Sequence, residues 1–343
     1  MAEMLYSQLR TAGRASLADL LPLKFPMSMY VETTNRCNLR CTYCPLSLPD
    51  YKDRVGGFLT LSMEDFTKIC RDIQEGGRLK VLRFYFMGEP LVNPHLPEMI
   101  ALARRMEVAE RLELTSNGVL LDEKRSLALL DSGLDYLRIS ISSVDPVRHA
   151  KVTATKVKVE TIRQNVLAFR RLRDGLGMSR PFLYVKMLQS ESEEENQAFI
   201  HMYQKVADEI CLEKPMNWDN RLEYDLIKAT YGEENKLDLT ASFPYPKAVC
   251  PFPFYTLVVS VNGDVTVCCV DWNKDTKVGN IHESTLSEIW QGERLRQLRL
   301  LHLNRQRDQN PSCCNCNFLY TTPDNLDELS NEKRVAMVGL NQG

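Results

Sequence analysis

The stretch "TTNRCNLRCTYCPLS", residues 33–47, places three cysteines within eight positions. Cys37, Cys41 and Cys44 have the spacing C-x3-C-x2-C, and no histidine stands nearby to complete a set of four ligands. Thiolates crowded onto one loop are ligands for zinc or for an iron–sulfur cluster. A cluster held by three cysteines leaves one iron open for a small molecule, whereas a zinc knuckle would need a distant fourth cysteine. The spacing favours the cluster.

On both sides of this loop, between residues 28 and 212, short apolar runs alternate with amphipathic helical stretches. About six such β-α units predict an α/β fold with a parallel sheet, a partial (β/α)6 TIM-like barrel. In parallel sheets of this kind, ligand-binding residues lie at the carboxyl ends of the strands. The cysteine loop, Gly88-Glu89-Pro90, Asn117 and residues 140–143 each follow a predicted strand. We therefore expect them to share one rim.

Six further cysteines lie between residues 250 and 316, around a predicted hairpin. The run "YTLVVSVNGDVTVCCV", residues 255–270, has an Asn-Gly turn between alternating apolar positions, which is typical of a β-hairpin. A helical stretch follows at residues 284–303. Four of the cysteines are placed to close one metal cluster, namely Cys250, Cys268, Cys313 and Cys316. Cys314 could replace Cys313, and a zinc ribbon on the same four ligands is the alternative.

Composition restricts the class of protein. The 343 residues are 44% hydrophobic and 26% charged, with a formal net charge of −2. A net charge near zero provides no positive surface potential that would attract nucleic acid. No apolar run approaches the roughly 18 residues of a membrane span. Of the eleven cysteines, nine are clustered in two groups, which indicates metal binding in a reducing compartment rather than disulfides. Because the N-terminus lacks a continuous apolar segment typical of a signal peptide, we expect a cytoplasmic protein without nucleic-acid or membrane partners.

The changes of pattern along the chain predict its domains. We expect an N-terminal helical extension at residues 1–27, a barrel at residues 28–212, a linker or lid at residues 213–249, a small α+β cluster domain at residues 250–320 and a tail at residues 321–343. The N-terminal extension is too short for a peptide-recognition domain.

The first cysteine motif, with Tyr43 before its last cysteine, resembles the radical S-adenosylmethionine (SAM) superfamily. The resemblance implies that Cys37, Cys41 and Cys44 hold a [4Fe–4S] cluster whose open iron chelates S-adenosylmethionine. It also implies contacts to S-adenosylmethionine from Tyr43, Gly88, Glu89, Pro90, Asn117, Ser140 and Ser142. Many relatives carry Ser-Ile-Asp-Gly after the fourth strand, whereas this chain has Ser140-Ile141-Ser142-Ser143. The acid is lost or replaced by Asp145.

The second cysteine group resembles the auxiliary-cluster domain of the SPASM/twitch branch. Because no cysteine follows Cys316, the resemblance implies the short, twitch-like form with one auxiliary [4Fe–4S] cluster on Cys250, Cys268, Cys313 and Cys316. Twitch-type relatives include dehydrogenases and epimerases of aminocyclitols and sugars. The implied activity is hydrogen abstraction by a 5′-deoxyadenosyl radical from a small polyol, sugar or aminocyclitol. The implied reductant is of the flavodoxin or ferredoxin type.

Alcohol oxidation is the favoured reaction, because a closed auxiliary cluster can accept the electron of a ketyl radical and leave a ketone. Epimerisation instead needs a hydrogen-atom donor, and Cys269 and Cys314 are the candidate thiols. Two further hypotheses are a peptide-modifying enzyme and a non-catalytic iron–sulfur or zinc protein.

Overall fold

The computed structural model describes residues 15–213, 247–314 and 316–338. Its strands form one open nine-stranded sheet in the order β6-β5-β4-β3-β2-β1-β7-β8-β9. The strands are β1 (Ser28–Val31), β2 (Leu79–Phe84), β3 (Ala109–Ser116), β4 (Tyr136–Ile141), β5 (Phe182–Leu188), β6 (Glu209–Glu213), β7 (Thr256–Val259), β8 (Asp264–Thr266) and β9 (Gly279–Asn280). Neighbouring strands from β1 to β6 are parallel. The predicted α/β fold with an unclosed partial barrel is confirmed.

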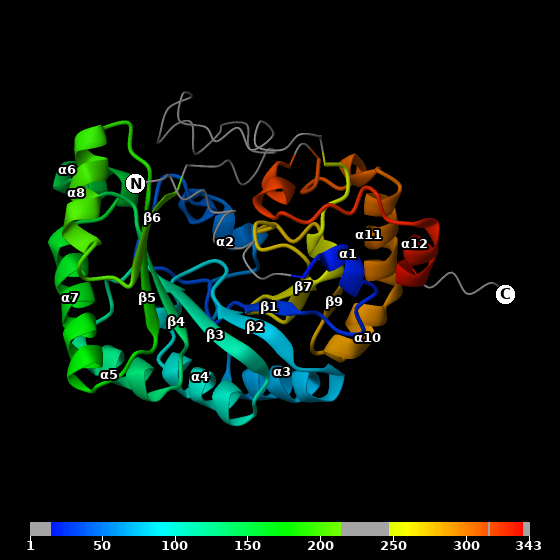
Figure 1. Cartoon of the computed structure of the whole chain (residues 1–343), viewed down its shortest axis with the longest axis horizontal. Helices are drawn as coiled ribbons and strands as arrows, with labels where there is room; N and C mark the ends of the chain where they lie inside the picture. Colours follow the sequence, from blue (N-terminus) through cyan, green and yellow to red (C-terminus); the bar gives the residue numbers. More distant parts are fainter. Residues whose placement is uncertain (1–14, 214–246, 315, 339–343) are drawn as a thin grey trace.

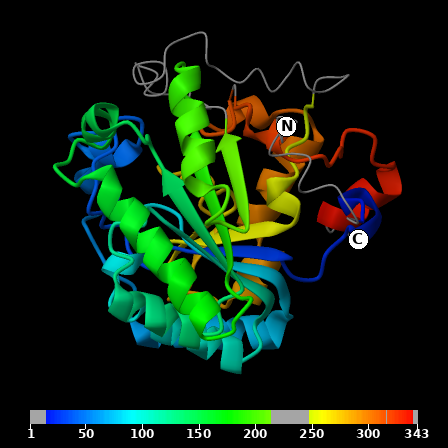
Figure 2. The same cartoon turned by 60° about the vertical axis from the view of Figure 1, so that its left-hand side comes forward.

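The longer helices connect these strands along one side of the sheet (Figures 1 and 2). They are α3 (Met63–Gly76), α4 (Leu96–Arg105), α5 (Glu123–Asp131), α7 (Val159–Gly175) and α8 (Glu193–Tyr203). Ser62, Asp122 and Ser192 cap the start of three of them, and each side chain accepts a hydrogen bond from the backbone N–H of the third helical residue. Within the described residues, no helix is long and apolar enough to cross a membrane.

The strands of the barrel alternate between an apolar face and a polar face. The apolar face packs against the helices in one core that includes Leu82, Leu114 and Val185. The residues between them, such as Arg83, Glu113 and Lys186, point to the opposite face because successive strand residues alternate. Buried parallel sheets are usually apolar on both faces. The polar face is therefore the surface on which we expect a ligand.

The predicted hairpin is present, and it extends the barrel sheet. β7 and β8 pair antiparallel, and β9 continues them. β7 also pairs with β1 in parallel, with Ser28 opposite Thr256 and Val31 opposite Val259. The core continues across this junction to Leu257, so the barrel and the C-terminal strands share one hydrophobic core. Nothing in the local pattern of either segment indicates this pairing.

The predicted helix at residues 284–303 is two helices, α10 (Leu286–Gln291) and α11 (Glu293–Leu303). Gly292 separates them with an extended backbone, φ −69° and ψ 157°. A helix that the sequence did not predict, α6 (Pro146–Thr153), follows β4. The expected extension and tail contain the short helices α1 (Leu17–Leu20) and α12 (Asn331–Val338), which share a small apolar core. The predicted linker or lid lies almost wholly outside the described residues.

Short elements complete the described chain. They are η2 (Pro45–Ser47), α2 (Tyr51–Arg54), η3 (Pro90–Val92), η5 (Phe252–Phe254), η6 (Arg307–Gln309) and η7 (Phe318–Thr321). Two of them, η2 and α2, follow the first cysteine loop directly and pack against each other as its support.

Candidate metal centres

The first cysteine loop follows β1 and is fixed by backbone hydrogen bonds. Arg40 N–H donates to the Thr153 carbonyl (3.1 Å) and Thr42 N–H to the Val152 carbonyl (2.8 Å), which ties the loop to the end of α6. Within the loop, Cys44 N–H donates to the Cys41 carbonyl (2.9 Å). The three thiols of Cys37, Cys41 and Cys44 are therefore carried by an ordered turn at the carboxyl end of a strand.

The surroundings of these thiols fit a bound cluster. An apolar shell that includes Leu46, Tyr51 and Trp272 packs against Cys37 and Cys44. Burial raises the pKa of Cys37 to about 12 and raises the pKa of Cys44 further, so the unliganded thiols keep their protons at neutral pH. A metal cluster must displace those protons, because thiolates are the ligands. Leu39 N–H points at the Cys37 sulfur (3.4 Å), a donor suited to a thiolate.

Gly88 and Glu89 lie at the carboxyl end of β2, beside this loop. Gly88 has φ +77°, and a Cβ atom there would stand 2.3 Å from the Thr34 carbonyl oxygen. The buried Glu89 carboxylate accepts hydrogen bonds from Ser116 Oγ (2.8 Å), Asn117 N–H (2.7 Å) and Leu91 N–H (3.1 Å). Glu89 thus fixes the end of β3 against the turn after β2. A contact of Gly88, Glu89 or Pro90 with S-adenosylmethionine stays a prediction.

The structure brings Asn117 and Ser142, two of the other predicted contacts, to the same loop. Asn117 Nδ2 donates to Asn38 Oδ1 (2.8 Å). Tyr43 and Ser142 share a hydrogen bond between their hydroxyls (2.9 Å), and Ser142 Oγ lies 3.9 Å from the Cys41 sulfur. Ser140 lies in β4 opposite Lys186 of β5.

Asp145, the possible replacement for the lost acid, caps a helix. It precedes α6, and its carboxylate accepts the Arg148 N–H (2.7 Å) as a helix cap. Sequence reasoning missed Asn38, whose buried Nδ2 has no hydrogen-bond partner within the described ranges. Asn38 stands between Cys37 and Cys41, and this place in the sequence could have singled it out, because an amide N–H donor at that position lies beside the predicted cluster ligands.

Glu32 joins the cysteine loop to the C-terminal strands, a contact that no sequence pattern indicates. The side chain is buried at the end of β1, and its Oε2 accepts Val261 N–H (2.9 Å) from the β7–β8 turn. Burial raises the pKa of Glu32 to about 7, against smaller opposing effects of the Val261 hydrogen bond and Lys274. Tyr51 and Trp272 pack nearby, with ring centroids 5.8 Å apart.

We expect Glu32→Gln to stabilise the protein at pH 8 more than at pH 5. The raised pKa means that the folded chain holds a proton that the unfolded chain releases above pH about 4.5. The stability contributed by Glu32 is thus present below that pH and is lost as the pH rises through about 7. Gln stays neutral and still accepts the Val261 N–H.

The gain at pH 8 should be about 1 to 3 kcal/mol, measured by anaerobic denaturant unfolding. Glu110→Gln, at an exposed carboxylate paired with Lys80, is the matched control and should give no such gain. An equal effect of Glu32→Gln at both pH values would contradict the assignment.

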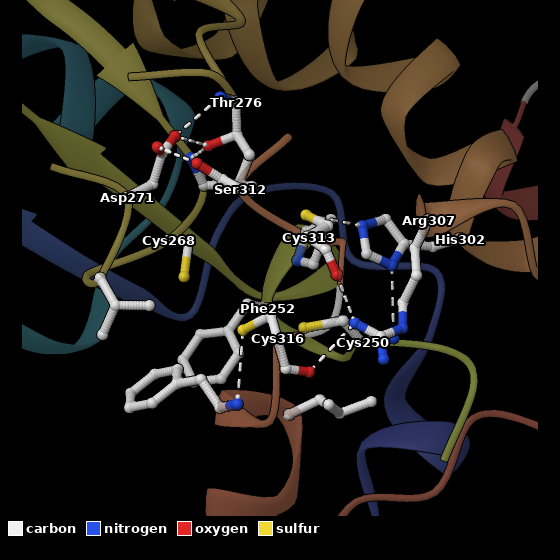
Figure 3. Close-up of a pocket in the computed structure, with 15 residues that line it drawn as sticks. Cys250, Phe252, Cys268, Asp271, Thr276, His302, Arg307, Ser312, Cys313 and Cys316 are labelled. Atoms are coloured by element: carbon white, nitrogen blue, oxygen red, sulfur yellow. Dashed lines mark hydrogen bonds between the residues drawn. The ribbon is translucent and has the colours of Figure 1, made fainter. Parts of the chain in front are cut away.

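The second cysteine group surrounds one cavity (Figure 3). Its sulfur-bearing lining is formed by Cys250, Cys268, Cys313 and Cys316. Phe252 and Phe318 stack beside it with ring centroids 5.0 Å apart. Burial, reinforced by the neighbouring cysteines, raises the pKa of Cys250 and of Cys268 well above its ordinary value. Four thiols that line one largely apolar cavity fit a closed iron–sulfur cluster.

Cys269 and Cys314 do not line this cavity. Cys269 follows Cys268 directly and lies near Tyr30, whose pKa it raises in addition to the larger effect of burial. Tyr30 is on the polar face of β1, since Met29 and Val31 on either side belong to the core with the helices. In addition to the larger effect of burial, Cys269 also raises the pKa of the cavity thiol Cys268, so Cys269 lies close both to that thiol and to Tyr30 on the barrel side. Among the described residues, no three His, Cys, Asp or Glu side chains form a single-ion site.

Comparisons with known proteins agree with this arrangement. Residues 31–182 match the Radical SAM superfamily model, and residues 250–317 match the SPASM model, an iron–sulfur cluster-binding domain. A tungsten-containing aldehyde ferredoxin oxidoreductase cofactor-modifying protein from Pyrococcus furiosus is 24% identical over 84% of this chain and 87% of its own. A PqqA peptide cyclase from Granulibacter bethesdensis is 37% identical, but over only 35% of this chain and 30% of the cyclase.

Solved structures share the fold. BtrN in complex with AdoMet and 2-DOIA has a TM-score of 0.53 at 18% identity, covering 85% of this chain and 93% of BtrN. SuiB from Streptococcus suis, bound to the precursor peptide SuiA, has a TM-score of 0.56 at 12% identity, covering 82% of this chain and 69% of SuiB. At these identities the likeness concerns the fold.

Proposed function

Because the chain carries a radical SAM domain followed by a SPASM domain, we propose that it is a radical SAM oxidoreductase acting on a small hydroxylated substrate. The substrate class is a polyol, sugar or aminocyclitol, and the favoured reaction converts a secondary alcohol to a ketone. Hydrogen abstraction from the carbinol carbon and release of the hydroxyl proton leave one electron to be removed. That electron leaves through the auxiliary cluster.

The radical SAM domain binds S-adenosylmethionine and a [4Fe–4S] cluster, and the SPASM domain binds further iron–sulfur. Together, the reduced cluster and S-adenosylmethionine supply a 5′-deoxyadenosyl radical that removes a hydrogen atom from carbon. In our proposal Cys37, Cys41 and Cys44 hold the first cluster. Tyr43 and the rim residues of β2, β3 and β4 described above hold S-adenosylmethionine, and Glu89 keeps the rim in place.

One observation carries the proposal: four thiols line the second cavity, whereas three occupy the first loop. Four protein ligands leave no open iron on the auxiliary cluster, which suits it to electron transfer rather than to substrate binding. The polar face of the barrel, with Arg83, Glu113 and Lys186, supports a substrate rich in hydroxyl groups. The reductant that starts the reaction is of the flavodoxin or ferredoxin type.

The test starts from reconstituted, anaerobic protein reduced in the presence of S-adenosylmethionine and a panel of aminocyclitols and sugars. Formation of 5′-deoxyadenosine with methionine, and one S-adenosylmethionine consumed per ketone, supports the proposal. Absence of 5′-deoxyadenosine with every substrate would reject it. About eight irons per chain correspond to two cubane clusters, and zinc alone would make the protein non-catalytic. Activity only with a peptide would instead indicate a peptide-modifying enzyme.

Epimerisation is the second candidate, because Cys269 lies toward the polar face near Tyr30. A thiol there could return a hydrogen atom to a substrate radical. Solvent deuterium at a carbon of inverted configuration, lost in Cys269→Ala, would favour this reaction over oxidation.

We expect Cys316→Ala to separate the two halves of the reaction. Cys316 lines only the second cavity, so S-adenosylmethionine cleavage should continue while ketone formation falls to background. Iron should fall to about four per chain, and the remaining EPR signal should be that of the cluster that binds S-adenosylmethionine. Unchanged ketone formation after loss of that iron would contradict a role of the auxiliary cluster in oxidation.

A further inference from the structure

His302 connects two of the four cavity cysteines, although no ligand spacing in the sequence points to it. It lies near the end of α11 and is 1% exposed. Its Nδ1 accepts the backbone N–H of Cys250 (3.4 Å), and its Nε2 lies 3.7 Å from the Cys313 sulfur (Figure 3). The ring therefore sits between a ligand segment before the hairpin and one after α11.

The contact with Cys250 decides which nitrogen carries the proton. A ring nitrogen that accepts a hydrogen bond has a free lone pair and no hydrogen. Since Nδ1 accepts from Cys250, the hydrogen of the neutral ring is on Nε2. That hydrogen faces the Cys313 sulfur. Cys313, once it is a cluster thiolate, is thus the acceptor of an N–H···S hydrogen bond from His302.

A second group acts on the same side of the cavity. Arg307 Nη1 donates to the Cys316 carbonyl (3.1 Å) and also to the Cys313 carbonyl. The guanidinium adds positive charge beside these two cysteines, and its attraction lowers the pKa of Cys250 against the larger effect of burial. Arg307 Nη1 donates to carbonyl oxygens, whereas His302 Nε2 faces a sulfur. Of these two side chains, His302 is therefore the one that donates directly to a thiolate.

We propose that His302 is a positioning residue that sets the reduction potential of the auxiliary cluster through this hydrogen bond to Cys313. Reduction adds negative charge to the cluster and its thiolates, and a hydrogen-bond donor stabilises that charge. His302 thereby raises the potential and makes the cluster a better acceptor for the substrate electron. The inference rests on the auxiliary cluster of the proposed function. It adds the residue that sets the reduction potential of that cluster.

Two substitutions of His302 each keep one of its two hydrogen bonds and remove the other. In His302→Gln the amide nitrogen reaches about the place of Nε2 and keeps the donor to Cys313. In His302→Asn the amide oxygen takes the place of Nδ1 and keeps the acceptor for Cys250, but the donor is lost. EPR-monitored redox titration of the full-length holoenzyme should show a lower auxiliary potential in His302→Asn and a nearly parental one in His302→Gln.

Equal potentials in the parent and both variants would overturn the inference, as would a fall in both. His201, on α8 and away from the cavity, provides the control: His201→Asn should leave the potential unchanged. Iron content is measured in parallel. If the parent protein holds no auxiliary cluster, the proposed function is contradicted. If it holds one whose potential does not depend on His302, only this inference is contradicted.

A measurement on the unaltered chain covers the case in which the variants do not fold. Protein labelled with 15N-histidine is reduced, and pulsed EPR is recorded on the auxiliary signal. A weak 15N coupling indicates the hydrogen bond. A strong coupling, expected for a histidine bound directly to iron, would overturn the inference, and so would the absence of any coupling.

Discussion

Replacing Cys37, Cys41 and Cys44 together by alanine should abolish cleavage of S-adenosylmethionine and leave the second cavity able to hold iron. The three thiols lie in the loop after β1, whereas the other four line a cavity formed by residues beyond position 249. Iron should therefore fall from about eight to about four per chain, not to zero. Formation of 5′-deoxyadenosine should fall to background, because the ligands of the first cluster are gone.

The measurements are iron content and quantification of 5′-deoxyadenosine after anaerobic reduction. Cys70→Ala is the matched control, since Cys70 is a fully buried thiol packed in the core between α3 and the sheet. It should retain full iron and cleavage at some cost in thermal stability. Persistent cleavage in the triple variant would contradict the assignment of the first cluster to these cysteines. Loss of all iron from it would show that the two cysteine groups are not independent centres.

Gly88→Ala should destabilise the protein by about 2 to 5 kcal/mol and disturb the cysteine loop. Two effects combine at this position. The backbone has φ +77°, which disfavours any side chain, and the new Cβ would stand 2.3 Å from the Thr34 carbonyl oxygen and 2.8 Å from that of Arg36. Both oxygens belong to the segment that leads into Cys37, so relief of the clash must move the first ligand.

Gly56→Ala measures the backbone part of this effect without the steric clash. Gly56 has the same φ of +77°, but nothing lies within 4 Å of the position of its Cβ. The cost at Gly56 should be about 1 to 2 kcal/mol, with iron content unchanged. Unfolding curves of both variants, together with iron content, give the difference. An equal loss of stability at Gly56 and Gly88 would show that close packing against Arg36 and Thr34 is unimportant.

The fold could be predicted because its signals are local. Ser62 and Asp122 begin helices as their side chains indicate, and the apolar, β-rich run that starts at Val81 lies in a strand. The cysteine spacings single out both candidate ligand groups for the same reason. What stayed hidden depends on contacts between distant residues. The pairing of β1 with β7 joins Ser28 to Thr256, 228 residues apart.

The site is less predictable than the fold, because side-chain roles depend on neighbours in space. The motif around Glu89 predicts contact with a ligand, and the structure uses the Glu89 carboxylate to hold the end of β3. Asp145 is a possible replacement acid by its place in the sequence, and it caps a helix that the sequence does not reveal. His302 has no spacing that could link it to Cys250, 52 residues earlier.

The position of β1 between β2 and β7 limits how this protein can be cut or recombined. A barrel fragment ending near residue 213 would leave β1 as a bare edge with unpaired backbone groups, a surface prone to self-association. A C-terminal module borrowed from another protein would have to offer a strand that matches Ser28–Val31 in register and presents an N–H to Glu32. Functional chimeras should therefore exchange β7, β8 and their turn as one piece with the cavity that follows them, because a single junction before β7 divides one sheet between two parent proteins.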